Sequence, residues 1–470
     1  MPEGAHDTLL RSAHVDLPGS TQNWAMGAIC LSIFLSIFDY TATNMALPVM
    51  ARDLHVGDES SLWILNAYQF SSLVTLFPLV AIGRKIGYKA LCMTGLVLLG
   101  VASIWCAQAQ SLVFLTLGRV VQGLGGACIM GANLALIRIV SSPENLGRRI
   151  GMNSTVIGLA VAMGPSLGAL IVAWSDWHML FWINVPLSSL ALFYTWTKLP
   201  RTEGAYGPVA IPRLIVLIGS LSLVVGGLDM AIHDVQRLWA TAALFAGVLS
   251  GVLLFRDQLS SSHPVFPADL YRHPLMARLS LVTIAAFIAS NLFLISIAFT
   301  LQGVLHRTAL VSGIAINAWP MGVITTSAAS GRNANRFPGA VLVTIGLLLM
   351  GSSFLGLWLV LPVDNLGVIM LCIFLAGMGS GIFQPPNNRM IMLMSRPGRE
   401  GGASAIASFS RLSGQTLGAM AVAWIFRLIP IQGGKLCLVS AAVISLLAAA
   451  ASFPTKARVT RRQSSDYFRS

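Results

Sequence analysis

Charged residues are scarce in this sequence. Asp, Glu, Lys and Arg together make up 10% of the 470 residues, whereas a soluble domain contains about 25%. Hydrophobic residues make up 55%, and the mean hydropathy is +0.76. This balance excludes an ordinary soluble protein and indicates a chain that crosses a membrane many times. The formal net charge of +13 is not gathered into basic runs with interleaved aromatic residues, so we expect no nucleic-acid partner.

The signatures of most enzyme and metal sites are also missing. The six cysteines are scattered through apolar segments without a CxxC pair or a Cys/His cluster, so neither disulfides nor a metal site is indicated. The sequence has no P-loop, so we do not expect ATP to drive this protein. It also has no GxSxG, HExxH or paired-carboxylate motif of an enzyme. We therefore expect no catalytic residue, no metal and no cofactor.

Long apolar segments predict an all-α polytopic membrane protein, because a helix needs about 20 apolar residues to cross the hydrocarbon. About fourteen segments meet this length, and they lie near residues 24–50, 62–82, 90–108, 111–136, 150–174, 178–197, 211–232, 237–255, 278–303, 309–330, 338–361, 366–387, 402–428 and 434–453. With the N-terminus in the cytoplasm, the cytoplasmic segments hold roughly 23 of the 30 Lys and Arg residues. Positive loops stay inside, so we predict that both termini are cytoplasmic.

An internal repeat divides the spans into two halves. The segment "VAMGPSLGALIVAW" at 161–174 is repeated in "RLSGQTLGAMAVAW" at 411–424. The turn "IGRKIGYK" at 82–89 has a weaker counterpart in "SGRNANRF" at 330–337, at nearly the same interval. Parallel repeats of six spans are a known transporter plan, with the substrate path between the halves. We therefore predict an N-terminal tail (1–22), an N-terminal six-helix half (23–198), a linker with two extra transmembrane helices (199–275), a C-terminal six-helix half (276–453) and a basic tail (454–470).

An aspartate and an arginine lie inside predicted spans. Asp39 is about 15 residues into the first span, hence ~22 Å from the cytoplasmic surface, and Arg119 is ~12 Å from the outer surface in the fourth span. In a hydrocarbon core ~30 Å thick these depths are similar, so the two side chains can meet. The pair is either a static ion pair or a proton site, in which Asp39 gains and loses a proton as Arg119 releases and engages it. Because intramembrane ionisable residues are functional by default, we favour proton coupling by Asp39 and Arg119.

Glycine-rich motifs are expected at close helix contacts. "GLAVAMGPSLGAL" places Gly158, Gly164, Pro165 and Gly168 in one span, where small residues let helices approach. These residues either pack only, or form a pliable seam between the halves that opens and closes during transport. In the turn between spans 2 and 3, the residues of a cytoplasmic gate loop are Gly83, Arg84, Gly87 and Lys89. The charges of this loop either brace one conformation or only obey the positive-inside rule.

Polar side chains within spans are the candidates for substrate binding. They are Asp39, Asn66, Tyr68, Gln122, Asn291 and Gln415. Each of them either lines a cavity or packs within its half. Asp229, the other acid within a span, lies near the outer end of its helix and is interpreted as a hydrated interfacial carboxylate.

The combination of these motifs resembles the fourteen-span drug:proton antiporter family of the major facilitator superfamily, over nearly the whole chain. "FDYTATNMALP" is similar to that family's span-1 motif, "GRVVQGLGGA" to its span-4 motif, "GLAVAMGPSLGAL" to its span-5 antiporter motif, and "FWINVP" to the start of its span 6. The resemblance implies the major facilitator fold and proton-driven export across a bacterial inner membrane. On that analogy Asp39 is the proton site and Arg119 its partner. In the gate loop, however, Arg84 stands where the family has an acid, and Tyr88 where it has an arginine.

The resemblance implies lipophilic, often cationic, drugs or toxic compounds as substrates. A dedicated proton-coupled exporter of one neutral or anionic metabolite is the alternative, and the scarcity of acids within the spans favours it modestly. A membrane sensor or scaffold is disfavoured because the predicted tails are short. The expected partners are a small-molecule substrate, protons and the lipid bilayer, and a periplasmic adaptor is left open.

Overall fold

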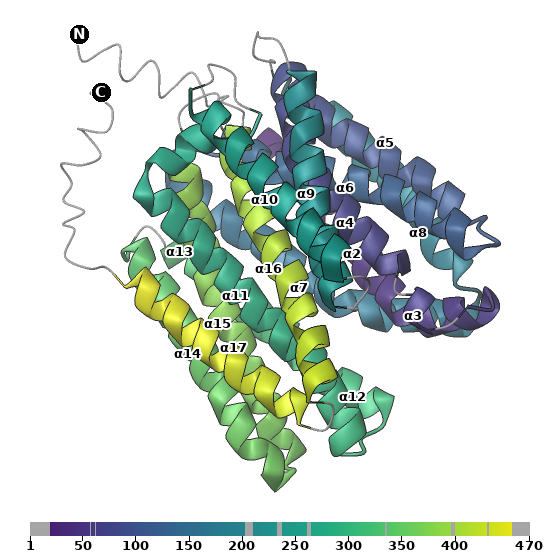
Figure 1. Cartoon of the computed structure of the whole chain (residues 1–470). Helices are drawn as coiled ribbons and strands as arrows, with labels where there is room; N and C mark the ends of the chain where they lie inside the picture. Colours follow the sequence, from purple (N-terminus) through teal and green to yellow (C-terminus); the bar gives the residue numbers. More distant parts are fainter. Residues whose placement is uncertain are drawn as a thin grey trace.

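The computed structural model describes residues 19–56, 58–61, 63–202, 210–232, 237–260, 265–333, 336–395, 400–429 and 432–453. Within these ranges every regular element is a helix, as Figure 1 shows. The tail predicted at 454–470 and most of the tail predicted at 1–22 lie outside the described residues. The first described helix begins at Gly19, several residues before the predicted start of the first span.

Six long helices form an N-terminal bundle, drawn in purple to blue in Figure 1. They are α2 (Gly19–Asp53), α4 (Trp63–Ile86), α5 (Tyr88–Cys106), α6 (Leu112–Ile139), α7 (Pro143–Trp174) and α8 (His178–Lys198), with the short α3 (Asp58–Ser61) after α2. Helix α6 packs between α4 and α5, whereas α2 packs against α7 and α8.

A second bundle follows in the C-terminal part of the chain, drawn in green to yellow. It contains α11 (Pro274–Phe299), α12 (Ala309–Ile316), α13 (Ala318–Asn333), α14 (Gly339–Val360), α15 (Leu366–Leu393), α16 (Glu400–Leu428) and α17 (Gly433–Ser452), with short turns η1 (Ala268–Arg272), η2 (Thr300–Val304) and η3 (Leu361–Val363). Helix α15 packs between α13 and α14, and α11 packs against α16 and α17. This arrangement repeats the helix order of the first bundle.

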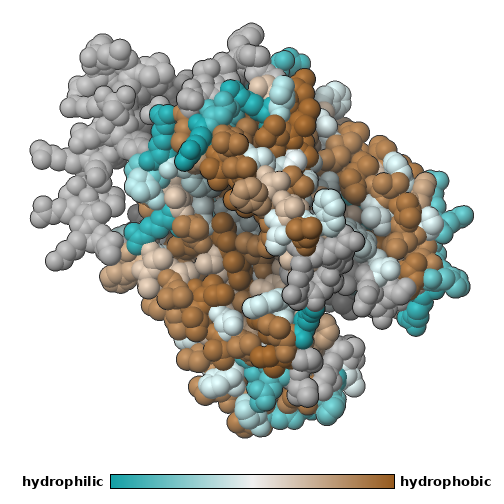
Figure 2. Space-filling model, viewed as in Figure 1, coloured by the Kyte–Doolittle hydropathy of each residue, from teal (hydrophilic) through white to brown (hydrophobic). Residues whose placement is uncertain are grey.

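The two helices between the bundles are α9 (Ile211–Ile232) and α10 (Arg237–Ser260). They form a hairpin, and α9 contacts both α4 and α16, so it lies over one side of the junction between the bundles. Helix α10 exposes large apolar side chains such as Trp239, Phe245 and Leu253. Figure 2 shows that apolar side chains cover much of the outer surface, as lipid contact requires.

Twelve of the described helices are long and apolar enough to cross a membrane, and not the fourteen that the sequence predicts. The difference lies at two places. The predicted span 309–330 divides into α12 and α13 at Asn317, and each piece is short. The predicted span 402–428 forms the 29-residue α16, which is less apolar because it contains Arg411 and Gln415.

The repeated glycine motif makes equivalent contacts in both bundles. A Cβ atom on Gly164 of α7 would lie 2.0 Å from Thr41 Oγ1 of α2, and one on Gly414 of α16 would lie 2.6 Å from the Ile284 carbonyl oxygen of α11. Each glycine therefore lets one helix pair within its own bundle approach closely. Buried apolar residues accordingly form two clusters, one centred on each bundle.

Candidate functional site

The Asp39 carboxylate and the Arg119 guanidinium form a buried ion pair inside the N-terminal bundle. Arg119 Nη1 on α6 donates to Asp39 Oδ2 on α2 at 2.6 Å, and the side chains are at most 1% exposed. Arg119 Nε also donates to the backbone oxygen of Ile64 on α4 at 3.2 Å. The pair therefore joins three helices through a single guanidinium.

Two amide side chains complete the shell around the carboxylate. Gln122 Nε2 donates to Asp39 Oδ1 at 3.3 Å, and its Oε1 accepts from Arg119 Nη1 at 2.7 Å. Asn184 Nδ2 on α8 donates to the same Asp39 Oδ1 at 2.5 Å. Asp39 thus accepts hydrogen bonds from three side chains on two neighbouring helices, an environment that suits the ionised carboxylate.

Aromatic rings close the remaining sides of Arg119. Its guanidinium carbon lies 4.7 Å from the ring centre of Tyr68 and 5.8 Å from that of Phe181, which is within the range of a cation–π contact. The Tyr68 hydroxyl hydrogen-bonds with Ser36 on α2. A Cβ atom on Gly126 would lie 2.4 Å from this hydroxyl, so the glycine in "GLGGA" makes room for Tyr68.

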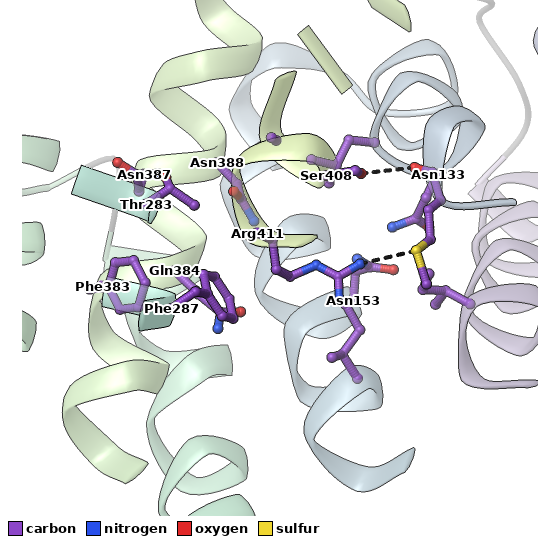
Figure 3. A pocket seen from close by; sticks show the side chains of 15 residues that line it. Asn133, Asn153, Thr283, Phe287, Phe383, Gln384, Asn387, Asn388, Ser408 and Arg411 are labelled. Carbon is purple, nitrogen blue, oxygen red and sulfur yellow. Dashed lines mark hydrogen bonds between the residues drawn. The ribbon is translucent and has the colours of Figure 1, made fainter. Parts of the chain in front are cut away.

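A cavity lies between the two bundles. It contains about 490 Å³ of space unoccupied by atoms, part of it open to solvent. Its apolar lining includes Phe287 and Phe383, whose ring centres lie 6.3 Å apart with the ring planes at 65°. Its polar lining residues, all labelled in Figure 3, are Asn133, Asn153, Thr283, Gln384, Asn387, Asn388, Ser408 and Arg411. These residues come from α6, α7, α11, α15 and α16, so both bundles form the cavity.

Helix α15 carries two prolines directly before two of its polar cavity residues. Pro385 and Pro386 stand inside the helix directly before Asn387. Proline has no N–H, so the carbonyl four residues earlier loses its partner. The Ser330 hydroxyl on α13 takes that place by donating to the Ile382 oxygen at 2.7 Å. Asn387 Nδ2 then donates to Thr283 Oγ1 on α11 at 2.8 Å.

None of the six substrate candidates from the sequence lines this cavity. Asp39, Tyr68 and Gln122 are buried inside the N-terminal bundle. Asn291 is half-buried and donates to the Phe287 backbone oxygen of its own helix. Asn66 is exposed and Gln415 is half-buried.

The predicted seam residues separate into two sets. Gly158 faces Val323 and Ile324 of α13 and therefore lies between the bundles. Gly164 and Gly168 face α2 of their own bundle instead, because α7 turns different faces to its two neighbours. Pro165 lies within α7, and its side chain is outside the described residues.

The gate loop is much shorter than predicted. Helix α4 continues to Ile86 and α5 begins at Tyr88, so Gly87 alone, with φ of 90°, makes the turn. Gly83 packs on Leu91, and Lys89 Nζ donates to two carbonyl oxygens at the end of α8, so both residues act within the N-terminal bundle.

The contact of this region with the second bundle is made by Tyr88. Its hydroxyl accepts a hydrogen bond from the Gly401 backbone N–H in the first turn of α16 at 3.1 Å. Arg84 lines a small crevice beside it with Gly402. Arg138 at the end of α6 also reaches the second bundle, where it donates to the Met392 oxygen and to Ser395 Oγ.

Sequence reasoning missed Asn184 and the amides of the cavity. Asn184 lies in "WINVP", where the aromatic residue suggested only an interfacial anchor. The signals that could have found them were the position of Asn184 in an apolar span and the run "QPPNN" on α15.

Comparisons with known proteins agree with this architecture. The family model described as Major Facilitator Superfamily matches residues 29–289 and 279–466. The uncharacterized transporter YebQ of Escherichia coli is 33% identical over 439 residues, which cover 93% of this chain and 96% of that protein. The riboflavin transporter RibZ of Clostridioides difficile is 22% identical, with 83% of this chain and 86% of that protein covered. Other bacterial relatives, 25–28% identical, are named as drug-resistance or multidrug efflux proteins.

The fold also has a solved counterpart. The crystal structure of the human organic anion transporter MFSD10 superposes with a TM-score of 0.71, covering 93% of this chain and all of that chain at 16% identity. At this identity the likeness supports the fold alone. Together with the family match over most of the sequence, it leads to one conclusion: the chain belongs to the major facilitator superfamily of membrane transporters.

Proposed function

We propose that this protein is a proton-driven exporter of the bacterial inner membrane, with Asp39 as the residue that carries the proton. The observation that supports this most strongly is the buried carboxylate, held by Arg119, Gln122 and Asn184 away from the cavity. A buried charge with this many partners is costly to build, and inside a membrane such residues mark proton relays.

The shell around Asp39 suits two protonation states. In the ionised state the carboxylate accepts from all three donors. When Asp39 binds a proton it gains an O–H donor, and the Asn184 side-chain oxygen, buried and without a hydrogen-bond partner, can accept from it after rotation of the amide. Arg119 then keeps the Ile64 oxygen, the Gln122 oxygen and the Tyr68 ring as partners. Proton binding to Asp39 thus weakens the ion pair between α2 and α6, while Arg119 keeps its other partners.

The proposal includes fourteen spans with both termini in the cytoplasm. Helix α16 has 29 residues, hence ~43 Å at 1.5 Å per residue, more than the ~30 Å core. It packs against α4, α6 and α11, so part of its surface faces protein and lower hydropathy is tolerated there. Helix α13 packs between α7 and α15 in the same way. Counting α16 and the α12–α13 pair adds two spans to the twelve apolar ones.

For the substrate, the cavity favours a neutral or anionic compound over a cation. None of the described residues that line it carries a carboxylate, and the one charged residue among them is Arg411. This revises the preference for cationic drugs that the sequence suggested. Export of lipophilic cations remains the second candidate, because several relatives are named as multidrug proteins.

Proton movement in proteoliposomes tests the proposal. The protein is reconstituted with an internal pH dye, a pH gradient is imposed, and 2-naphthoate, riboflavin or ethidium is added. We expect at least one compound to trigger proton movement in the wild type and in Asp229→Asn, which removes another acid of an apolar helix. Asp39→Asn is expected to abolish it. Unchanged proton movement in Asp39→Asn would show that Asp39 is structural and would overturn the proposal.

A further inference from the structure

The charge of the cavity between the bundles is unbalanced. Among the described residues, its lining contains one cation, Arg411, and no carboxylate, while seven further polar residues are amides and hydroxyls. A cation in a membrane interior normally pairs with an acid or with backbone oxygens. Arg119 follows this rule, with a carboxylate, an amide oxygen and a backbone oxygen as partners. Arg411 does not follow it.

Arg411 has little to bind within the described part of the chain. Its Nη2 lies 3.3 Å from the sulfur of Met130, and a thioether is a weak acceptor. No described carboxylate lies within 4.0 Å of it as an ion pair. A guanidinium has five N–H donors and stays protonated, so most of its donors remain available to a ligand.

The surroundings of Arg411 define the shape of that ligand. Figure 3 shows the side chain extending from α16 between Phe287 and Gln384 on one side and Asn133 and Asn153 on the other. The half-buried Phe287 ring offers an apolar surface to a flat body, and the buried Phe383 ring packs edge-on against it. The planar guanidinium fits a carboxylate or a similar oxyanion through two parallel hydrogen bonds.

We propose that this cavity binds small organic anions with a flat aromatic body, with the anionic group on Arg411 and the body against Phe287. The inference deepens the proposed function and rests on it only for the statement that the bound anion is exported. A ligand anion would supply the counter-charge that the protein itself lacks at this position.

Equilibrium binding to the purified full-length protein, with no pH gradient, tests the site. The probes are 2-naphthoate, its neutral amide 2-naphthamide and the cation 2-naphthylmethylammonium, which share one ring system and differ in charge. The variants are Arg411→Gln and Arg411→Lys. The matched control is Arg332→Gln, which removes an exposed arginine at the end of α13.

The wild type is expected to bind naphthoate at least about 30-fold more tightly than Arg411→Gln does, because losing one partner of a desolvated charge pair has at least this effect. Arg411→Lys should keep the order of carboxylate over amide, with weaker binding because the planar fork is lost. Arg332→Gln should bind like the wild type. The wild-type comparison of the three probes needs no variant, so it holds even if Arg411→Gln fails to fold.

Two results would overturn the inference. One is equal or tighter binding of the amide or the ammonium probe by the wild type. The other is a preference for naphthoate that survives in Arg411→Gln. The proteoliposome assay separates this inference from the proposed function. Proton movement triggered by the ammonium probe and not by naphthoate would refute the anion site and leave proton coupling standing. Arg411-dependent naphthoate binding without any coupled proton movement would support the anion site and refute the proposed proton coupling.

Discussion

Removing either charge of the Asp39–Arg119 pair is expected to destabilise the protein strongly, whereas removing both should cost much less. The side chains are at most 1% exposed and joined at 2.6 Å, so each charge has exchanged water for the other. Deleting one partner of such a pair costs about 3–5 kcal/mol because the remaining charge is stranded. Asp39→Asn should lie near the lower value, since Arg119 keeps the Ile64 and Gln122 oxygens.

The two single variants should also differ in their response to pH. A guanidinium stays charged at any working pH, whereas a stranded carboxylate can bind a proton. In Arg119→Gln, the folded protein would hold a proton on Asp39 that the unfolded chain releases at neutral pH. The unfolded state then binds fewer protons than the folded state, so stability falls as the pH rises. The loss of stability of Arg119→Gln relative to the wild type should therefore be smaller at pH 5 than at pH 8. The loss of stability of Asp39→Asn should change little with pH.

Thermal unfolding in detergent, followed by the fluorescence of the 11 tryptophans, measures these effects. For a cooperative unit of 150–250 residues, 3 kcal/mol corresponds to a fall in Tm of roughly 6–12 °C. Asp257→Asn is the control, because it breaks an ion pair with Arg213 that is partly exposed and should cost less than about 1 kcal/mol. The reasoning fails if the single variants lose no more than this control, or if their losses simply add in the double variant.

Two further predictions concern packing and closure. Gly164→Val should prevent stable folding, because its Cβ would lie 2.0 Å from Thr41 Oγ1, whereas Gly219→Val on α9 should fold, because no other atom lies within 4 Å of its Cβ position. Size-exclusion profiles compare the two variants, and a folded Gly164→Val protein would contradict the close contact. Tyr88→Phe removes the acceptor for the Gly401 N–H and should weaken contact between the bundles by about 1 kcal/mol. A cysteine placed at Gly402 should then react faster with a maleimide, and an unchanged rate would show that Tyr88 does not hold this end closed.

The sequence was sufficient to predict the contact of Asp39 with Arg119. Charged residues stand out in apolar spans, and the rise of an α-helix converts their positions into depths that can be compared. The glycine repeat likewise predicted equivalent positions in the two halves, and the structure gives both glycines the same kind of contact within their bundles.

Other features depend on contacts that no local pattern reveals. Asn184 is neutral and lies two residues after Trp182, so its position in an apolar span marks it as unusual but does not identify Asp39 as its partner. The cavity forms only where six helices, several of them distant in sequence, meet. Charges misled the prediction of the gate loop, because Arg84 and Lys85 continue α4 past its apolar part. Hydropathy also separates α16 from the other long helices, because it carries polar residues such as the half-buried Arg411 and Gln415.

The placement of the two charged sites has a consequence for how such a protein can diversify. The shell around Asp39 comes entirely from the N-terminal bundle, whereas Arg411 and most of the polar cavity residues come from the C-terminal bundle. Under the proposed function, the residues that couple protons and most of those that select the substrate therefore lie in different halves of the chain. We expect a chimera that joins residues 19–202 of this chain to the second half of a relative to keep the proton coupling of this chain. Its substrate selectivity should follow mainly the relative.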